Sequence, residues 1–395
     1  MNKLNIFKFI YFLFILFFFY LVLVALDILI PRIPKILSTN YKESQKIIKE
    51  RQIEDNQSLN IINAEILPYV YTQDYNLHPL KKFVKKHDII PLGTLPYKDL
   101  ILCSEGYEVI KIKTDRFGFR NNDSLWTSKD VETVLIGDSF ADGQCVQEEF
   151  SIAGILNKKG HKTLRLAQGG YSSIHYAFMA KIFLPIIKPK NLVILFYEND
   201  YDLIDVNEYH YKYFFKKNIN DYINFVDLEP YPNETLKSFD EDINNFINEV
   251  HKQNKYSIFD TTKMNFDKLQ KYFFLSNIQK NFSSLTNPKK LLGSNSLAID
   301  TAIDVCKNIK CNVHFVLIRG SNYWDPQPDF YYENYKSSLQ IYLEKNGKEL
   351  ITFDNIIDYK NKKNYAPKGP HGSVEFNNIV ASKIYKILNT NNSYK

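Results

Sequence analysis

Ser139 and His371 lie far apart in the chain, but their types and neighbours suit a nucleophile and its base. Ser139 lies in GDSF, directly after the apolar run VETVLIG, where a buried strand is expected to pass into a helix. His371 lies in KGPH, just before the last helical pattern. A serine hydroxyl becomes a strong nucleophile when an imidazole takes its proton. The pair therefore predicts acyl-transfer chemistry where the two side chains meet.

Two further residues could stabilise the oxyanion that such chemistry creates. Gly170 follows the second apolar run in GGYSS, and Asn199 follows the third in YEND. The backbone N–H groups of Ser139 and Gly170 and the side-chain amide of Asn199 are three donors of the kind an oxyanion hole uses. The carboxyl ends of parallel strands meet at one edge of a sheet, so we expect all these residues there.

In the order Ser139, Gly170, Asn199 and His371, the motifs resemble the sequence blocks of the SGNH, or GDSL-type, hydrolase family. The resemblance covers about 131–395, apart from an insertion. It implies a flavodoxin-like three-layer α/β sandwich and a serine esterase that acts on ester bonds. It also implies that Ser139 and His371 are catalytic, that Ser139, Gly170 and Asn199 form the oxyanion hole, and that no cofactor or metal is needed.

The chain departs from the family pattern beside the histidine. The family block reads D-x-x-H, but Lys368 occupies the position of the aspartate that normally orients the imidazole. Three interpretations stay open: another acid serves, with Asp358 or Glu375 the nearest in sequence; a backbone carbonyl orients His371 in a Ser–His dyad; or the enzyme is weak or inactive. In the last case the chain would be a carbohydrate-binding or assembly protein on a degenerate scaffold.

Apolar runs that alternate with amphipathic stretches predict the elements that position these residues. From residue 131 onward the alternation is typical of a parallel sheet with helices on both faces. Strands are expected at 131–137, 161–167, 191–197, 311–318 and 348–354, and helices at 150–158, 174–187, 296–309, 331–347 and 373–388. An aromatic insertion at about 205–290 is expected to cover the carboxyl edge of the sheet or to form a packing lobe away from the site.

The first 30 residues predict an uncleaved transmembrane anchor. Phe9 to Leu26 carries no charge and, at about 1.5 Å per residue, is long enough to cross a bilayer core. A signal peptide is the alternative, but the apolar stretch is long and no small-residue cleavage motif follows it. Lys3 and Lys8 precede the segment, so the body is expected on the extracytoplasmic side of a bacterial inner membrane.

Residues 31–130 are expected to form a linker and a small β accessory region. The part up to residue 60 is polar and indicates a juxtamembrane helix or linker, and the part after it has short apolar runs typical of β-hairpins. The stretch TDRFGFRN at 114–121 is similar to membrane-anchored bacterial members of the SGNH family. Cys306 and Cys311 flank a helix-to-strand turn and either pair or stay as separate buried thiols, whereas Cys145 is expected only to pack.

The composition of the chain argues against some classes of binding partner. The 395 residues carry a net charge of +6, but only six of the 50 cationic residues are arginine and no basic stripe is present, so nucleic acid is not expected. A flavodoxin-like phosphate binder is also disfavoured, because GDSFADG lacks the glycines and lysine of a phosphate loop. The expected substrate is an acylated carbohydrate or another small ester. Hydrolysis and O-acyl transfer would use the same residues, and the oligomeric state stays open.

Overall fold

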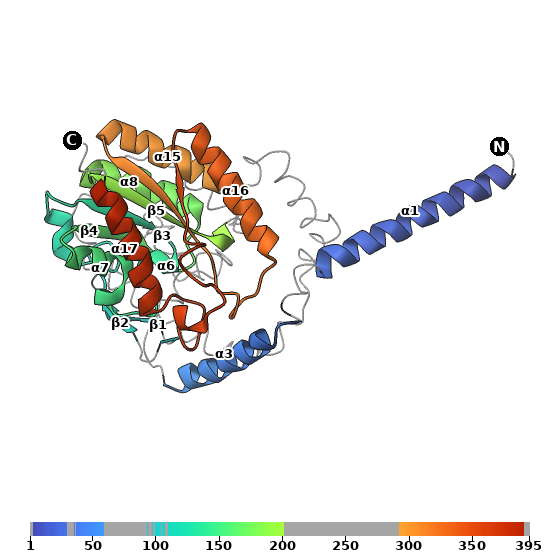
Figure 1. Ribbon diagram of the computed structural model, residues 1–395, viewed down its shortest axis with the longest axis horizontal. Helices are drawn as coiled ribbons and strands as arrows, with labels where there is room; N and C mark the ends of the chain where they lie inside the picture. The colour runs from blue at the N-terminus through green and yellow to red at the C-terminus, as the bar shows by residue number, and fades with distance from the viewer. Residues whose placement is uncertain are drawn as a thin grey trace, which may run out of the picture.

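The structure is a computed structural model. It describes residues 3–29, 35, 37–58, 93, 97, 99–103, 105–106, 110–200 and 292–390. The insertion expected at 205–290 and most of the region at 61–98 lie outside the described residues. Figure 1 shows the chain from α1 at the N-terminus to α17 near the C-terminus.

A parallel sheet of five strands forms the centre of the fold. Its strands are β3 (Thr133–Gly137), β4 (Thr163–Ala167), β5 (Asn191–Tyr197), β6 (Asn312–Ile318) and β7 (Leu350–Ile351). They lie in the order β4-β3-β5-β6-β7, and every neighbouring pair is parallel. Numbered from β3, this is the order 2-1-3-4-5 of flavodoxin-like sheets. The predicted α/β class and parallel sheet are therefore confirmed.

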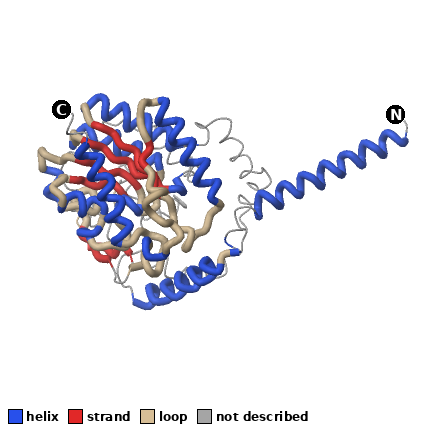
Figure 2. The backbone as a smooth tube through the Cα atoms, in the orientation of Figure 1, coloured by secondary structure: helices blue, strands red, loops and turns tan. Residues whose placement is uncertain are grey.

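Helices cover both faces of the sheet because its strands are apolar on both sides. They are α6 (Ser139–Asp142), α7 (Ile152–Lys158), α8 (Ser173–Ile187), α15 (Ser294–Ile309), α16 (Asp329–Lys345) and α17 (Val374–Thr390). Val134 and Ile136 of β3 pack with α8, α15 and α16, whereas Leu135 between them packs with α6, α7 and α17. Figure 2 shows the red strands enclosed between these helices. The result is a three-layer sandwich.

The last strand is shorter than the sequence suggests. The pattern KELITFD predicts a strand at 348–354, but only Leu350 and Ile351 join the ladder. They pair with Phe315 and Val316 of β6. β7 lies at the edge of the sheet and has a neighbour on one side only, so its flanking residues need not be extended.

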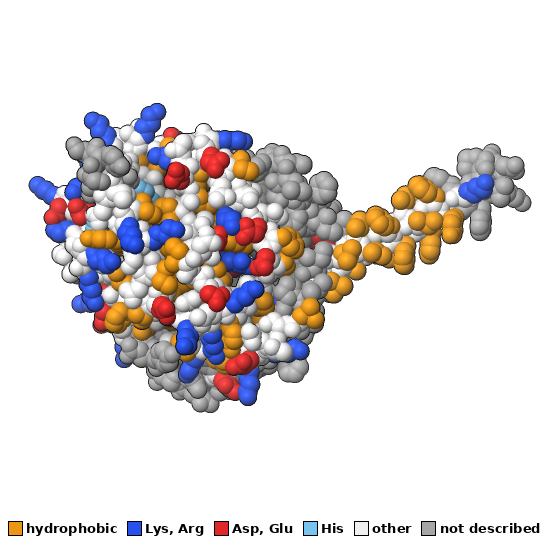
Figure 3. All heavy atoms as spheres, viewed as in Figure 1, with side chains coloured by type: hydrophobic (Ala, Val, Ile, Leu, Met, Phe, Trp, Pro, Cys, Tyr) orange, Lys and Arg blue, Asp and Glu red, His pale blue; other side chains and the backbone are white. Residues whose placement is uncertain are grey.

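Two helices precede the sheet domain. The first, α1 (Lys3–Leu29), contains one stretch long and apolar enough to cross a membrane, Ile10–Leu29, and its described apolar side chains are largely exposed. In Figure 3 these side chains form the orange surface that projects from the body. The second, α3 (Thr39–Ser58), packs Ile47 and Ile48 against the cluster that contains α17. The region expected to be a juxtamembrane helix or a linker therefore contains a helix that packs on the domain.

The accessory region contributes an antiparallel hairpin, β1 (Asp99–Cys103) and β2 (Ile110–Lys113). The stretch after β2 fastens this hairpin to the sheet domain. Asp115 accepts hydrogen bonds from the backbone N–H groups of Phe117 and Phe119 and from the indole of Trp126. These three aromatic residues belong to the core cluster on one face of the sheet. The region at 114–126 is thus an integral part of the packed domain.

Candidate active site at the carboxyl edge of the sheet

Ser139 lies at the turn from the central strand β3 into α6. Asp138 is the N-cap residue of α6, and its side chain accepts the N–H of Phe140 at 3.0 Å. Ser139 is the first residue of the helix, so its own N–H has no acceptor within the helix. The residue is 9% exposed. The expected place of Ser139, at the carboxyl end of a buried parallel strand, is therefore the place observed.

A buried carboxylate holds the ring of His371. Glu105 Oε2 lies 2.8 Å from His371 Nδ1, and the backbone N–H of His371 approaches the same oxygen at 3.4 Å. Glu105 is 4% exposed and comes from the segment just after β1. A carboxylate at Nδ1 holds the ring proton on that nitrogen, which makes Nε2 the basic nitrogen, and it stabilises the imidazolium that forms when Nε2 is protonated. The acids named from the sequence do not have this position: Asp358 and Glu375 are both exposed, and Asp358 accepts the backbone N–H of Lys360.

Two residues near His371, Lys368 and Gly369, lie in contact with Glu105. The N–H of Lys368 donates to the carbonyl of Glu105 at 2.9 Å, which pairs the two segments. A Cβ at Gly369 would lie 2.0 Å from both Cδ and Oε2 of Glu105, so only glycine leaves room for this carboxylate. Glu105, whose carboxylate lies against Gly369, therefore contacts His371 where an aspartate at position 368 would be expected to do so.

The same contacts bring His371 to the turn that carries Ser139. The ring of Phe140, the residue after the serine, lies 5.6 Å from the ring of His371 and stacks on Tyr197 at 4.5 Å. Burial raises the pKa of Asp138 to about 6, while the hydrogen bond from Phe140 and the positive charge of His371 oppose this rise. His371 thus lies beside Phe140, the residue after Ser139, at the carboxyl edge of the sheet, although 232 positions separate Ser139 and His371 in sequence.

Gly170 and Asn199 lie at the ends of the two strands beside β3. Gly170 has a φ of 78°, a conformation that glycine adopts without strain, and it is exposed. Asn199 is exposed as well, at the end of β5. Its neighbour Asp200 is fully buried and accepts the N–H of Tyr197 at 2.9 Å and the hydroxyl of Tyr176 at 3.3 Å. These bonds fix the end of the strand next to the exposed Asn199.

Several buried carboxyls around the site have raised pKa values. Burial raises the pKa of Asp142 to about 6, against the opposing charges of Arg165 and Arg120. Burial also raises the pKa of Glu198 to about 7, although Arg319 lies 3.7 Å away. Perturbed carboxyls that gather at one edge of a sheet are typical of functional sites.

A disulfide between Cys103 and Cys145 lies against Glu105. The expectation that Cys145 only packs was wrong, because 42 positions separate the two cysteines and no local pattern links them. Ligand-type atoms of Cys103, Glu105 and Cys145 lie within 4.8 Å of one another, but both sulfurs are in the disulfide, so neither is a thiolate ligand. Cys306 and Cys311 form a second disulfide, which settles the alternative left open by the sequence.

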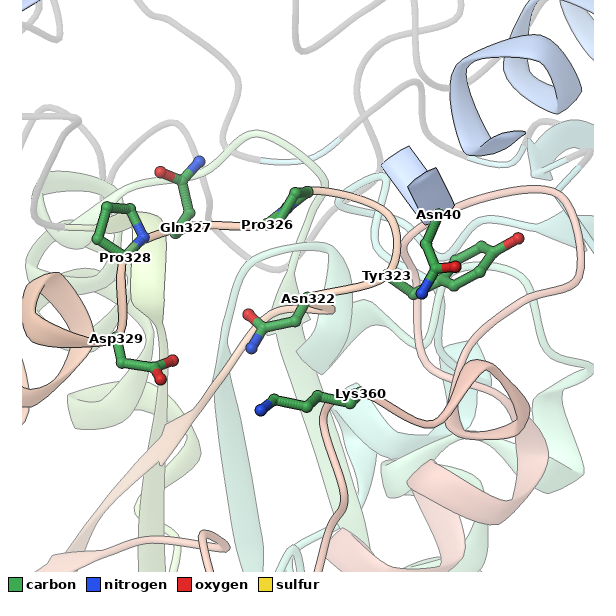
Figure 4. A pocket seen from close by; sticks show the side chains of 8 residues that line it. All are labelled: Asn40, Asn322, Tyr323, Pro326, Gln327, Pro328, Asp329 and Lys360. Carbon is green, nitrogen blue, oxygen red and sulfur yellow. The ribbon is translucent and has the colours of Figure 1, made fainter. Parts of the chain in front are cut away.

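A cavity of about 410 Å³, lined by polar and apolar side chains, opens between the start of α3 and the loop after β6 (Figure 4). It is lined by Asn40, Asn322, Tyr323, Pro326, Gln327, Pro328, Asp329 and Lys360. In Figure 4 the side chains of Asn322, Asp329 and Lys360 point toward one space. The loop leaves the carboxyl end of β6, so the cavity belongs to the same edge of the sheet as Ser139.

Two other histidines do not belong to the site. His175 lies in the first turn of α8, where its ring stacks on Tyr171 at 4.4 Å and completes a capping box with Ser172. His314 is a half-buried residue of β6, and burial lowers its pKa to about 4. Both side chains therefore have local packing or capping roles.

Comparisons with known proteins give no family by sequence. No family model matches the chain, and no curated protein does. Among solved structures, a protein from Bacteroides fragilis described as an acylhydrolase matches at 11% identity over 66% of this chain and 88% of its own, with a TM-score of 0.36. TesA matches at 9% identity over 65% and 97%, with a TM-score of 0.35. At these values neither structure carries an argument about activity, and the fold class rests on the strand order given above.

Proposed function

We propose that the chain is a serine esterase of SGNH type that acts on O-acyl groups. The hydrogen bond that the buried Glu105 carboxylate accepts from His371, beside the turn that bears Ser139, is the observation that carries the proposal. Without a carboxylate on its histidine, the site would be left as a Ser–His dyad or as a degenerate binding protein. The presence of Glu105 in place of the missing aspartate favours catalysis instead.

The proposed reaction has two acyl-transfer steps. His371 Nε2 takes the proton of the Ser139 hydroxyl as its oxygen attacks the ester carbonyl, and Glu105 stabilises the imidazolium. The N–H groups of Ser139 and Gly170 and the amide of Asn199 donate to the oxyanion. The imidazolium then protonates the departing alcohol, which leaves an acyl-serine. Water, deprotonated by His371, releases the acid and restores the hydroxyl.

A carbohydrate carrier for the acyl group is supported by the cavity between α3 and the loop after β6. Asn40, Asn322 and Lys360 offer hydrogen-bond donors, Asp329 offers acceptors, and Tyr323 contributes an aromatic residue to the wall. Hydroxyl-rich rings are bound by such mixtures of amides, charges and an aromatic residue. A sugar hydroxyl held there in place of water would make the same site an O-acyltransferase, so the ratio of transfer to hydrolysis in the presence of an acceptor glycan distinguishes the two activities.

The two disulfides and α1 support a location on the outer side of a membrane. Disulfides persist in oxidising compartments and are rare in the cytosol. With Ile10–Leu29 as a single span and the lysines of the N-terminus retained inside, the catalytic body would face the periplasm. Thiol alkylation of native membranes tests this directly: all four cysteines should react only after reduction.

A fluorophosphonate probe tests the activity on the full chain in detergent. We expect a covalent adduct that peptide mass spectrometry maps to Ser139, and its loss in Ser139→Ala and His371→Ala. Ser382→Ala, which removes a half-buried hydroxyl of α17, is the matched control and should label as the wild type does. Folded wild-type protein that forms no adduct would contradict the proposal.

A further inference from the structure

We propose that the Cys103–Cys145 disulfide positions Glu105 on His371, so that turnover requires this bond to be oxidised. The inference rests on the proposed esterase function and concerns the regulation of the same site. The bond joins the end of β1 to the loop after α6, two residues before Glu105 and six after Ser139. It therefore links the segment that carries the acid to the segment that carries the nucleophile.

The disulfide contacts the carboxylate residue at both ends. The backbone N–H of Glu105 lies 3.2 Å from Cys103 Sγ, and Glu105 Oε2 lies 3.6 Å from Cys145 Sγ. Both cysteines are buried, at 1% and 7% exposure. A displacement of either sulfur is thus transmitted directly to the residue that holds His371.

One end of the bond is rigidly anchored in the sheet domain. Arg120, which is 4% exposed, donates to the carbonyls of Gly143 at 2.8 Å and Val146 at 2.8 Å, on either side of Cys145. Arg165 donates to the carbonyl of Asp142 in the same loop. The loop after α6 therefore has a fixed path, and the disulfide passes this constraint to the Glu105 segment.

Few apolar side chains pack around the end of the β1–β2 hairpin that carries Cys103. The buried cluster there has five members, which are Leu102, Cys103, Ile110, Cys145 and Ala366. Two of these are the disulfide cysteines themselves. Hydrogen bonds to Lys368 and His371 also connect the Glu105 segment to the sheet domain. The disulfide is therefore the covalent tether between the Glu105 segment and the nucleophile loop, and it acts together with these hydrogen bonds.

Reduction would release this tether. A dithiol reductant gives two electrons and two protons to the disulfide, is itself oxidised to a cyclic disulfide, and leaves two thiols. Two unbonded sulfur atoms need more space than two bonded ones, so the hairpin end must move away from the loop. The 2.8 Å bond between Glu105 and His371 would then lengthen or break.

The chain contains its own control disulfide. Cys306 and Cys311 connect the end of α15 to the residue before β6, at the amino edge of the sheet, opposite the site. The test compares wild type, Cys103→Ala/Cys145→Ala and Cys306→Ala/Cys311→Ala in detergent, at a temperature where circular dichroism shows all three folded. The readouts are turnover of p-nitrophenyl acetate and the rate of fluorophosphonate labelling, each from pH 5 to 9.

We expect the first pair to lower both rates by about 100-fold, and the control pair to change them less than twofold. Loss of the anion beside His371 should also move the acid limb of the pH profile about one pH unit lower. Asp138 and Asp142, whose charges also act on His371, remain in every variant, so the movement reports Glu105. Adding Glu105→Gln to the first pair should cause no further loss, because the carboxylate is already displaced.

A readout independent of catalysis separates this inference from the proposed function. With ¹⁵N-histidine labelling, the ring signals of His371, assigned by their absence in His371→Ala, give its titration midpoint in each variant. A lower midpoint in the first pair with no turnover in any protein would refute the esterase and support the tether. Turnover and midpoint within error of wild type in Cys103→Ala/Cys145→Ala would overturn the inference.

Discussion

Replacing Gly369 by alanine should inactivate the site without touching a reacting group. The added Cβ would lie 2.0 Å from Glu105 Cδ and Oε2, whereas ordinary contact begins at 3.4 Å, so the carboxylate must retreat by about 1.4 Å. The bond between Glu105 and His371 is 2.8 Å long, and a retreat of this size carries it beyond hydrogen-bond reach. We therefore expect Gly369→Ala to behave as a loss of the carboxylate.

The magnitude follows from what a carboxylate contributes in serine hydrolases. Removing the acid of a triad lowers kcat by up to about 10⁴-fold, so we expect a loss of about 10²- to 10⁴-fold, or about 3 to 5 kcal/mol of transition-state stabilisation. KM for a small ester should change little, since Glu105 does not face the substrate. Glu105→Gln should lose the same amount, and the double variant Glu105→Gln/Gly369→Ala should lose no more than either.

The assay is steady-state hydrolysis of p-nitrophenyl acetate, with urea unfolding on the same preparations. Gly347→Ala is the control for a glycine substitution: its Cβ meets nothing within 4 Å, but its φ of 65° makes alanine strained. It should lose about 1 kcal/mol of unfolding free energy and keep full activity. If Gly369→Ala retains wild-type kcat while folded, or if the losses of the double variant add, Glu105 does not act through His371.

Three further outcomes follow from the same contacts. Burial raises the pKa of Glu198 to about 7, above its value in the unfolded chain, so the folded protein favours the protonated carboxyl. The unfolding free energy should therefore fall as pH rises from about 5 to 8. In urea titrations at several pH values, Glu198→Gln should make this fall smaller. Removing the Cys306–Cys311 disulfide, which closes a short loop, should lower the unfolding free energy by about 2 kcal/mol and leave kcat unchanged in the ester assay. Lys360→Ala, in the cavity wall, should raise KM for an O-acetylated oligosaccharide several-fold and leave KM for p-nitrophenyl acetate unchanged; equal effects on both would count against glycan binding there.

The sheet and the place of Ser139 could be predicted because local patterns determine them. Short apolar runs followed by glycine or acidic residues define buried strands, and the carboxyl ends of parallel strands must share an edge. The same rule predicted that Gly170 and Asn199 would lie beside Ser139. The predicted bounds of the central strands agree with the structure. The predicted strand at 348–354 was too long, because β7 pairs on one side only and its flanking residues form no ladder hydrogen bonds.

Glu105 could not be found from the sequence, because nothing local connects it to His371. It lies 266 positions earlier, in a hairpin outside the region that shows the strand–helix alternation. Spacing rules find acids near the histidine, which is why Asp358 and Glu375 were considered. The available signals were indirect: a lysine in place of the expected aspartate, a glycine beside it, and a cysteine two residues before a buried glutamate.

The order of the cysteines along the chain has a consequence for biogenesis. Cys103 pairs with Cys145, the next cysteine to be made, and Cys306 pairs with Cys311, the next again. A chain exported in the order of its synthesis, with its N-terminus retained inside, presents its thiols in this sequence, so each native bond joins the first two unpaired thiols to emerge. An oxidase that acts on successive cysteines would therefore generate the native pairing directly, and maturation should proceed without a disulfide isomerase.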